Sequence, residues 1–269
     1  MLAARINGED CAAGHSISVD DRGLNYGDGL FETMLLQQGS IRFFHAHLGR
    51  LRQSCERLAM RYPGDEVLDK DVSALTKDVR DGVVKILLTR GSGGRGYRPA
   101  KDSAPTRIVT LHARPDPKTE IKAQWCSTRL SRNPALAGMK HTNRLEQVLA
   151  AAELIDSWID EGLMLDLEGE VVCGTSSNVF IVRHGELMTP DLRYCGVRGI
   201  MRAQVLRTAH SLGIAFHEEP LYPHDIEAAS ELFVTNAVRG IRAVIQLAEH
   251  EWPRGSITEA LSQALDAHA

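Results

Sequence analysis

The stretch GMKHTNRLEQ, residues 138–147, places a lysine between a loop and a predicted helix. Asn143 is followed three residues later by Glu146, which matches a capping box, so we expect a helix to begin here. Lys140 would then lie just outside the helix N-terminus, where the positive end of the helix dipole disfavours a cation. A lysine amine becomes a nucleophile when desolvation or a nearby positive charge lowers its pKa. A lysine exposed on a surface loop is the plain alternative.

The residues downstream of Lys140 predict a helix over residues 144–160 with one apolar face. Its expected buried stripe comprises Leu145, Val148, Leu149, Ala152, Ile155 and Ile159. Around this helix, the second half of the chain alternates short apolar runs with glycine turns and further helical patterns. We expect strands at 124–130, 163–167, 179–182 and 231–236, and helices at 199–212 and 257–268.

The first half of the chain predicts a separate α+β unit. Apolar runs predict strands at 30–36, 41–43, 83–90 and 107–113, and a helix at 45–60 with Leu48, Leu51, Cys55 and Leu58 on one face. The segment RPDPKTE, residues 114–120, has two prolines and four charges and is typical of a linker. We therefore expect a smaller α+β N-terminal domain (1–113) and a larger α/β C-terminal domain (121–269), with a site in the crevice between them.

Composition excludes several classes of function. The 269 residues are 43% hydrophobic and carry a formal charge of -4 with no basic block, so a nucleic-acid partner is not expected. No run approaches the roughly 20 apolar residues of a membrane span. The start of the chain, MLAARINGED, has no apolar signal region, which predicts a cytoplasmic location. The five cysteines are widely spaced without a CxxC pair, and His45 and His47 would face apart on a helix, so no metal site is expected.

Two glycine-rich segments are candidates for binding anions. In GVRGIMRAQV, residues 196–205, glycines lead into a helix whose first amides, at Ile200 and Met201, would be free to bind a phosphate. An ordinary loop before a helix is the alternative. RGSGGRGY, residues 90–97, matches neither a P-loop nor a dinucleotide fingerprint. We interpret it as a flexible, substrate-facing loop with Arg95 as a carboxylate ligand; a plain surface hairpin is the alternative.

Seven segments together carry a resemblance to a known family. They are DRGLNYGDGLFET (21–33), HLGRL (47–51), RGSGGRGY (90–97), RNPALAGMKHTNRLEQVLAAAE (132–153), GTSSNVF (174–180), GVRGIMR (196–202) and FVTNAVRGI (233–241). In this order and spacing the chain resembles the fold-type IV pyridoxal-phosphate enzymes. Within that group it is most similar to the 4-amino-4-deoxychorismate lyases. Branched-chain and D-amino-acid aminotransferases share the lysine, but the residues around it look different.

The resemblance implies a role for each of a small set of residues. Lys140 is similar to the family's catalytic Schiff-base lysine, which would hold pyridoxal 5'-phosphate. The implied cofactor-binding set is Lys140, Arg50, Cys173, the amides of Ile200 and Met201, and the hydroxyl of Thr235. The expected substrate-binding residues are Arg95, Tyr26 and Asn143. The resemblance also implies a homodimer with a small-molecule substrate.

Cys173 departs from the family pattern. Most members have a glutamate here, before the GTxSN run, which hydrogen-bonds the pyridine nitrogen of the cofactor and strengthens its electron withdrawal. A thiol is a weak donor and acceptor, and a thiolate stabilised by the pyridinium is the alternative. A lyase whose product gains aromaticity would tolerate this loss better than a transaminase.

The resemblance implies that 4-amino-4-deoxychorismate is converted to 4-aminobenzoate, a folate precursor, and pyruvate. Lys140 would act as the general base. One alternative is a class IV aminotransferase acting on D-amino or branched-chain amino acids. Another is a non-catalytic protein that binds a phosphate or a cofactor.

Overall fold

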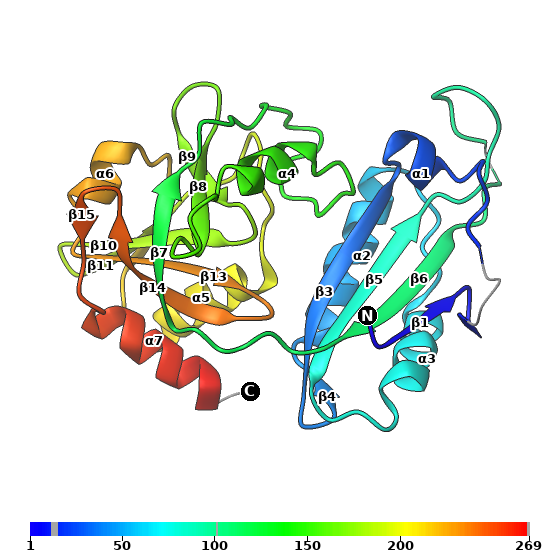
Figure 1. Cartoon of the computed structure of the whole chain (residues 1–269), viewed down its shortest axis with the longest axis horizontal. Coiled ribbons are helices and arrows are strands. Elements are labelled where there is room, and N and C mark those ends of the chain that lie inside the picture. The colour runs from blue at the N-terminus through cyan, green and yellow to red at the C-terminus, as the bar shows by residue number, and fades with distance from the viewer. Residues whose placement is uncertain (12–15, 101, 268–269) are drawn as a thin grey trace. The chain divides into compact units, whose positions relative to one another are not determined.

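The computed structural model describes residues 1–11, 16–100 and 102–267, and the chain forms two compact units (Figure 1). Unit 1 comprises Met1–Pro115 together with Met139–Asn143, and unit 2 comprises Asp116–Gly138 and Arg144–Ala269. The short segment around Lys140 therefore packs with unit 1, a detail that the expected domain limits do not contain. The expected linker, residues 114–120, includes the first residue of a strand of unit 2.

Unit 1 is built on an antiparallel sheet. Within the described residues it has six strands in the order β2-β1-β6-β5-β3-β4. The bounds are β1 Ala3–Ile6, β2 Glu9–Asp10, β3 Gly29–Gln37, β4 Ser40–Ile41, β5 Gly82–Thr89 and β6 Thr106–His112, with helices α1 Arg22–Tyr26, α2 Phe44–Arg57 and α3 Asp65–Thr76.

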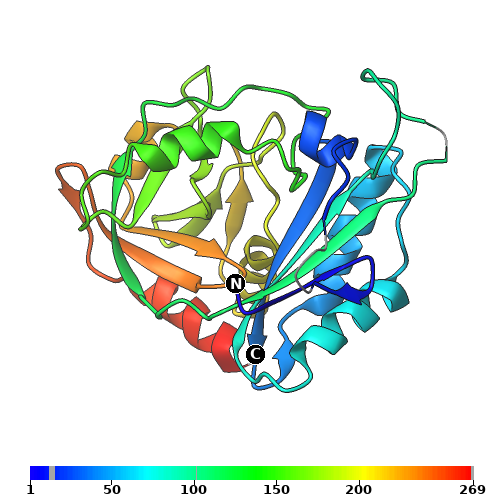
Figure 2. The same cartoon turned by 45° about the vertical axis from the view of Figure 1, so that its right-hand side comes forward.

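Both longer helices of unit 1 cover the same face of this sheet. Because side chains alternate along a strand, Leu30, Met34 and Leu36 of β3 share one face. They are buried in one cluster with Leu48 of α2 and Leu68 of α3. Figures 1 and 2 both show α2 and α3 behind the same side of the strands.

Unit 2 contains a mixed sheet. In the described part of the chain it has nine strands, in the order β12-β11-β10-β13-β14-β7-β8-β9, with β15 paired to β14. The strand bounds are β7 Glu120–Trp125, β8 Glu161–Leu165, β9 Val171–Gly174, β10 Asn178–Arg183, β11 Glu186–Thr189, β12 Phe216–Glu218, β13 Glu231–Asn236, β14 Gly240–Leu247 and β15 His250–Glu251. The helices are α4 Leu145–Ala152, α5 Ile200–Ser211, α6 Pro223–Glu227 and α7 Ser256–Ala267.

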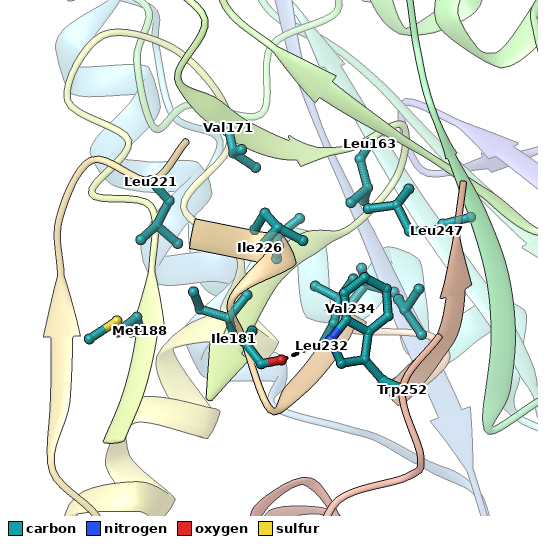
Figure 3. Close-up of a cluster of buried hydrophobic side chains, with 14 of the residues drawn as sticks. Leu163, Val171, Ile181, Met188, Leu221, Ile226, Leu232, Val234, Leu247 and Trp252 are labelled. Atoms are coloured by element: carbon teal, nitrogen blue, oxygen red, sulfur yellow. Dashed lines mark hydrogen bonds between the residues drawn. The ribbon is translucent and has the colours of Figure 1, made fainter. Parts of the chain in front are cut away.

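The main core of unit 2 collects side chains from strands that are distant in the sequence. Figure 3 shows Leu163, Ile181 and Val234 in one cluster with Ile226 of α6. Trp252 closes the cluster, and its indole N–H donates a 2.9 Å hydrogen bond to the carbonyl of Ala229. The buried indole therefore has its polar atom satisfied, as packing in an apolar core requires.

Most of the expected elements are confirmed. β3, β5 and β6 correspond to three of the predicted strands of the first half, and β13 covers the predicted strand 231–236. The predicted face of α2 is buried at Leu48, Leu51 and Cys55. The terminal helix α7 also corresponds to its prediction, whose last residue, His268, lies outside the described residues.

The prediction for the helix after Lys140 was wrong in three respects. Helix α4 starts at Leu145 and ends at Ala152, and much of its expected stripe is exposed, with Leu145 70% and Ile155 87% accessible. The residue before the helix is Arg144, which has no side-chain capping bond. Asn143 instead donates from Nδ2 to the carbonyl of Gly27, and the carboxylate of Glu146 accepts a bond from the amide of Ser131. An apolar stripe has the same periodicity whether it faces a core or solvent, which explains this error.

The strand expected at 124–130 also lies earlier, at Glu120–Trp125. Among the described residues, no helix is long and apolar enough to cross a membrane.

Candidate active site

Lys140 lies in an extended segment of unit 1 and not at a helix N-terminus. Its carbonyl accepts a 2.9 Å hydrogen bond from the amide of Phe31, and the amide of Thr142 donates to the carbonyl of Gly29 at 2.9 Å. The segment thus runs beside the start of β3, and the argument from the dipole of the following helix was wrong. The ammonium nitrogen lies 4.3 Å from the centroid of the Phe31 ring, within the range of a cation–π contact.

The segment that carries Lys140 is also tied to the end of α1. The hydroxyl of Thr142 donates to the carbonyl of Gly27 at 2.6 Å, and Nδ2 of Asn143 donates to the same carbonyl at 3.0 Å. The expected substrate-binding residue Asn143 therefore anchors the lysine segment. These bonds hold the backbone on both sides of Lys140.

Arg50 is held by a buried carboxylate. Its Nε donates to Oε1 of Glu32 at 2.8 Å, and a second guanidinium nitrogen contacts Oε2 of the same carboxylate. Oε2 also lies 2.6 Å from Nδ1 of His47, whose side chain is fully buried. Burial raises the pKa of Glu32, but the charge of Arg50 and the bonds from His47 and Arg50 outweigh burial and hold this pKa at about 2. The two-point contact fixes the plane of the Arg50 guanidinium.

The helix start that was expected to bind an anion, at the beginning of α5, lies in unit 2. Gly199 precedes the helix and supplies no side-chain cap, so Ile200 and Met201 present the first amides of the helix. A Cβ at Gly199 would lie 2.1 Å from Oδ1 of Asn178. Nδ2 of Asn178 donates to the carbonyl of Val197 at 2.8 Å. Asn178 therefore holds the segment that enters α5 and excludes any side chain at position 199.

Thr235 belongs to the same part of unit 2. It pairs with Asn178 across β10 and β13, and its buried hydroxyl donates a 2.9 Å bond to the carbonyl of Gly240. Rotation of the hydroxyl would let it donate to a neighbouring anion instead. Uncapped helix amides, a required glycine and a nearby hydroxyl suit a phosphate group, so these residues fit the phosphate of the implied cofactor.

Cys173 lies on β9 inside an apolar cluster. Its neighbours there include Cys126, Met164 and Leu192. Burial raises the pKa of the Cys173 thiol to about 12, and the charge of Arg144 only partly opposes this. At neutral pH these surroundings favour the thiol over the thiolate.

Glu161, a buried residue of β8, was not among the residues predicted for the site. Its carboxylate accepts bonds from the hydroxyls of Thr175 at 2.5 Å, Ser176 at 3.3 Å and Ser177 at 2.9 Å, and from the guanidinium of Arg242 at 3.0 Å. The hydroxyls of the GTSSN turn therefore point towards Glu161. Three consecutive hydroxyl residues were the available signal, because buried hydroxyls need a polar partner.

Tyr26 contacts the Gly-rich loop of unit 1, and Arg95 belongs to that loop. The hydroxyl of Tyr26 accepts a 3.2 Å bond from the amide of Gly96, and its ring lies edge-on to Tyr97 with 5.5 Å between centroids. Arg95 lies one residue before Gly96 and is exposed. The structure thus places the two expected substrate-binding residues at one loop.

A sequence model of the amino-transferase class IV family matches residues 29–247. The chain belongs to this family. Class IV aminotransferases use pyridoxal phosphate, so the chain is a pyridoxal-phosphate-dependent enzyme with the fold that the resemblance implied. The matched region includes Lys140, Arg50, the start of α5 and Thr235.

Several class IV relatives cover most of the chain. An aminodeoxychorismate lyase of Vibrio harveyi is 32% identical, with 93% of this chain and 96% of the relative covered. A protein of Methanocaldococcus jannaschii, provisionally named a branched-chain-amino-acid aminotransferase, is 35% identical, with 86% of this chain and 82% of the relative covered. The crystal structure of 4-amino-4-deoxychorismate lyase from Pseudomonas aeruginosa is 41% identical, with a TM-score of 0.92 and 98% of both chains covered.

Proposed function

We propose that the chain is an aminodeoxychorismate lyase, which converts 4-amino-4-deoxychorismate to 4-aminobenzoate and pyruvate. The observation that carries this proposal is the similarity to the lyase of Pseudomonas aeruginosa, with 41% identity over 98% of both chains. The similarity to the Vibrio harveyi lyase over nearly the full length gives independent support.

In the proposed mechanism, the amides of Ile200 and Met201 and the hydroxyl of Thr235 would bind the phosphate of the cofactor. The family resemblance also implies a cofactor contact for Arg50, whose guanidinium Glu32 orients. Pyridoxal phosphate, when bound, supplies the electron withdrawal that makes the proton on the amine-bearing carbon acidic. Glu161 keeps the hydroxyls of the GTSSN turn directed into the protein.

Lys140 is the proposed general base. Its neutral amine takes the proton from the substrate carbon that bears the amino group. The C–O bond to the enolpyruvyl group then breaks, a new ring double bond forms, and the leaving group accepts a proton to become pyruvate. The ring becomes aromatic in this step. The driving force of aromatisation fits a site in which the neutral thiol of Cys173 stands where most members of the family have a glutamate.

The deciding experiment is a coupled assay. Aminodeoxychorismate is generated in place, the purified protein and pyridoxal phosphate are added without a keto acid, and 4-aminobenzoate and pyruvate are both measured. Equal amounts of the two products are expected. If neither product formed, but a branched-chain amino acid or D-alanine transferred its amino group to 2-oxoglutarate, the chain would be an aminotransferase. The similarity to the Methanocaldococcus jannaschii protein is what favours that alternative.

We also propose that a second copy of the chain covers the exposed face of α4. Leu145, Val148 and Leu149 lie on one face of the helix and are each more than half accessible. Ile155 and Trp158, which follow the helix, are also more than half accessible. Apolar side chains gathered in this way are typical of an interface. Light scattering is expected to give the mass of a dimer for the wild type and of a monomer for Leu149→Glu. A monomeric wild type would contradict this assembly.

A further inference from the structure

Arg22, the first residue of α1, is a buried arginine whose guanidinium binds the Gly-rich loop of unit 1. Only 3% of its surface is accessible. One terminal nitrogen donates to the carbonyl of Gly96 at 2.9 Å, and the other donates to the carbonyl of Tyr97 at 2.7 Å. The backbone amide of Arg22 donates to the carbonyl of Gly91 at 2.9 Å. This one residue therefore holds both ends of the segment from Gly91 to Tyr97.

The guanidinium of Arg22 is itself fixed to the rest of unit 1. Its Nε donates to Oδ2 of Asp28 at 2.9 Å, and the same oxygen accepts a 2.7 Å bond from Nε of Arg90. The terminal nitrogens of Arg90 donate to the carbonyls of Leu58 and Ala59, just beyond the end of α2. Burial raises the pKa of Asp28, but the two arginines outweigh burial and lower it, so the carboxylate stays charged. The loop is thus tied through charged groups to the helix that carries Arg50.

Tyr26 adds a second contact between α1 and the loop. Its ring lies 4.8 Å from the guanidinium carbon of Arg22, and its hydroxyl accepts the bond from the amide of Gly96 described above. At the other end of the loop, Gly91 has φ +86°, and a Cβ there would lie 1.8 Å from the carbonyl of Ala104. Only glycine fits this position, so the loop is shaped for this one arrangement.

We propose that Arg22 is a positioning residue for substrate binding. Its hydrogen bonds to the loop hold the backbone of Arg95 in the position from which the Arg95 side chain binds a substrate carboxylate. Arg95 lies inside the segment that Arg22 holds, next to Gly96, whose amide and carbonyl both form hydrogen bonds with side chains of α1. An arginine on a fixed backbone loses less conformational freedom when it binds a carboxylate than one on a free loop. This inference rests on the proposed function, since it takes the loop to face the substrate.

The test compares Arg22→Met with Arg107→Met in the holoenzyme. Arg107 is a matched control, because it is a mostly buried arginine of the same unit whose Nε bonds Asp71 of α3 at 2.9 Å and does not bond the loop. Two measurements are made: the rate of tryptic cleavage after Arg95 in the native protein, and the kinetics of the lyase reaction. For Arg22→Met we expect cleavage to be about tenfold faster. We also expect KM to rise about tenfold while kcat changes less than about threefold. Arg107→Met should change neither.

A milder variant keeps the proposal testable if Arg22→Met does not fold. Tyr26→Phe removes only the hydroxyl that accepts from Gly96, and cleavage and KM should each rise about threefold, again without a matching fall in kcat. Unchanged cleavage in both variants, or faster cleavage with an unchanged KM, would overturn the inference. Absence of lyase turnover in the wild type is a separate outcome, seen before any substitution, which would overturn the proposed function and with it the role of the loop in substrate binding.

Discussion

At the scale of single residues, Lys140 shares its contact with the Phe31 ring with a second lysine, for which no catalytic role is proposed. Lys85 of β5 lies 5.1 Å from the centroid of the Phe31 ring, and Lys140 lies 4.3 Å from the same centroid. Both lysines therefore contact one aromatic ring. Of the two, only Lys140 belongs to the segment 139–143. This segment is part of unit 1, although the residues before and after it in the sequence belong to unit 2.

We predict that Lys140→Ala abolishes both turnover and the absorption band of bound pyridoxal phosphate. The hydrogen bonds that hold the segment use the backbone of residue 140, so the variant should fold normally. Lys85→Ala should retain the band and the activity, which separates covalent chemistry from the shared contact with Phe31. Absorption spectra and the coupled assay measure both quantities. A Lys140→Ala enzyme with normal activity would refute the assignment.

Cys173 leads to a prediction about pH dependence. Its thiol is buried with a pKa raised to about 12, so it carries no charge in the range in which the enzyme would work. Cys173→Ser replaces one neutral group with another of similar size. We expect activity within about threefold of the wild type and the same pH profile between pH 6 and about 9, a range in which an unperturbed thiol would titrate but a buried one would not. If the substitution removed a limb of the profile, the wild-type thiol would have to titrate in that range.

At the scale of secondary-structure elements, the start of α5 depends on the absence of a side chain at position 199. Because a Cβ there would lie 2.1 Å from Asn178, Gly199→Ala must displace either the helix start or Asn178. We predict an affinity for pyridoxal phosphate about tenfold weaker, with the fold retained. Gly49→Ala is the control, since a Cβ at Gly49 of α2 has no neighbour within 4 Å. Fluorescence titration of the apoenzyme measures the affinity, and equal affinities in the two variants would contradict the proposed phosphate site.

The elements show which parts of the site the sequence could predict. The start of α5 was predictable, because a glycine before an apolar helix is a local signal and the helix amides follow from backbone geometry. The three hydroxyls of the GTSSN turn indicated a polar partner but not that this partner is Glu161, because only the fold brings the turn and Arg242 of β14 to it.

The prediction for helix α4 was wrong for a different reason. The apolar period of Leu145, Val148 and Leu149 was read as a core stripe, yet these side chains are exposed in the chain. The sequence records that a face is apolar, but not which surface covers it. The predicted capping box does not form, because the side-chain amide of Asn143 donates to the carbonyl of Gly27, a partner more than 100 residues away in the sequence.

At the scale of the whole molecule, the described residues of each unit include a carboxylate whose pKa is lowered from 4.5 to about 2. In unit 1 this is Glu32, where Arg50 and His47 outweigh the effect of burial. In unit 2 it is Glu153, which accepts bonds from the hydroxyl and amide of Thr128 and from the amide of Ser127. The two carboxylates have no hydrogen-bond partner in common, so their contributions to the free energy of unfolding should be additive.

The sign of the pH effect follows from the direction of these shifts. A carboxylate with a lowered pKa in the folded state stabilises the fold fully above its unfolded pKa, and this stabilisation is lost as the pH falls through the folded value. We therefore predict that the free energy of unfolding of the apoenzyme, measured in urea, falls steeply between pH 4.5 and about 2. Glu32→Gln and Glu153→Gln should each be less stable than the wild type at pH 7. Each deficit should vanish towards pH 2, because protonation then removes the same charge from the wild type. A deficit that stayed constant over this range would mean that lost packing, and not the carboxylate charge, accounts for the effect of the substitution.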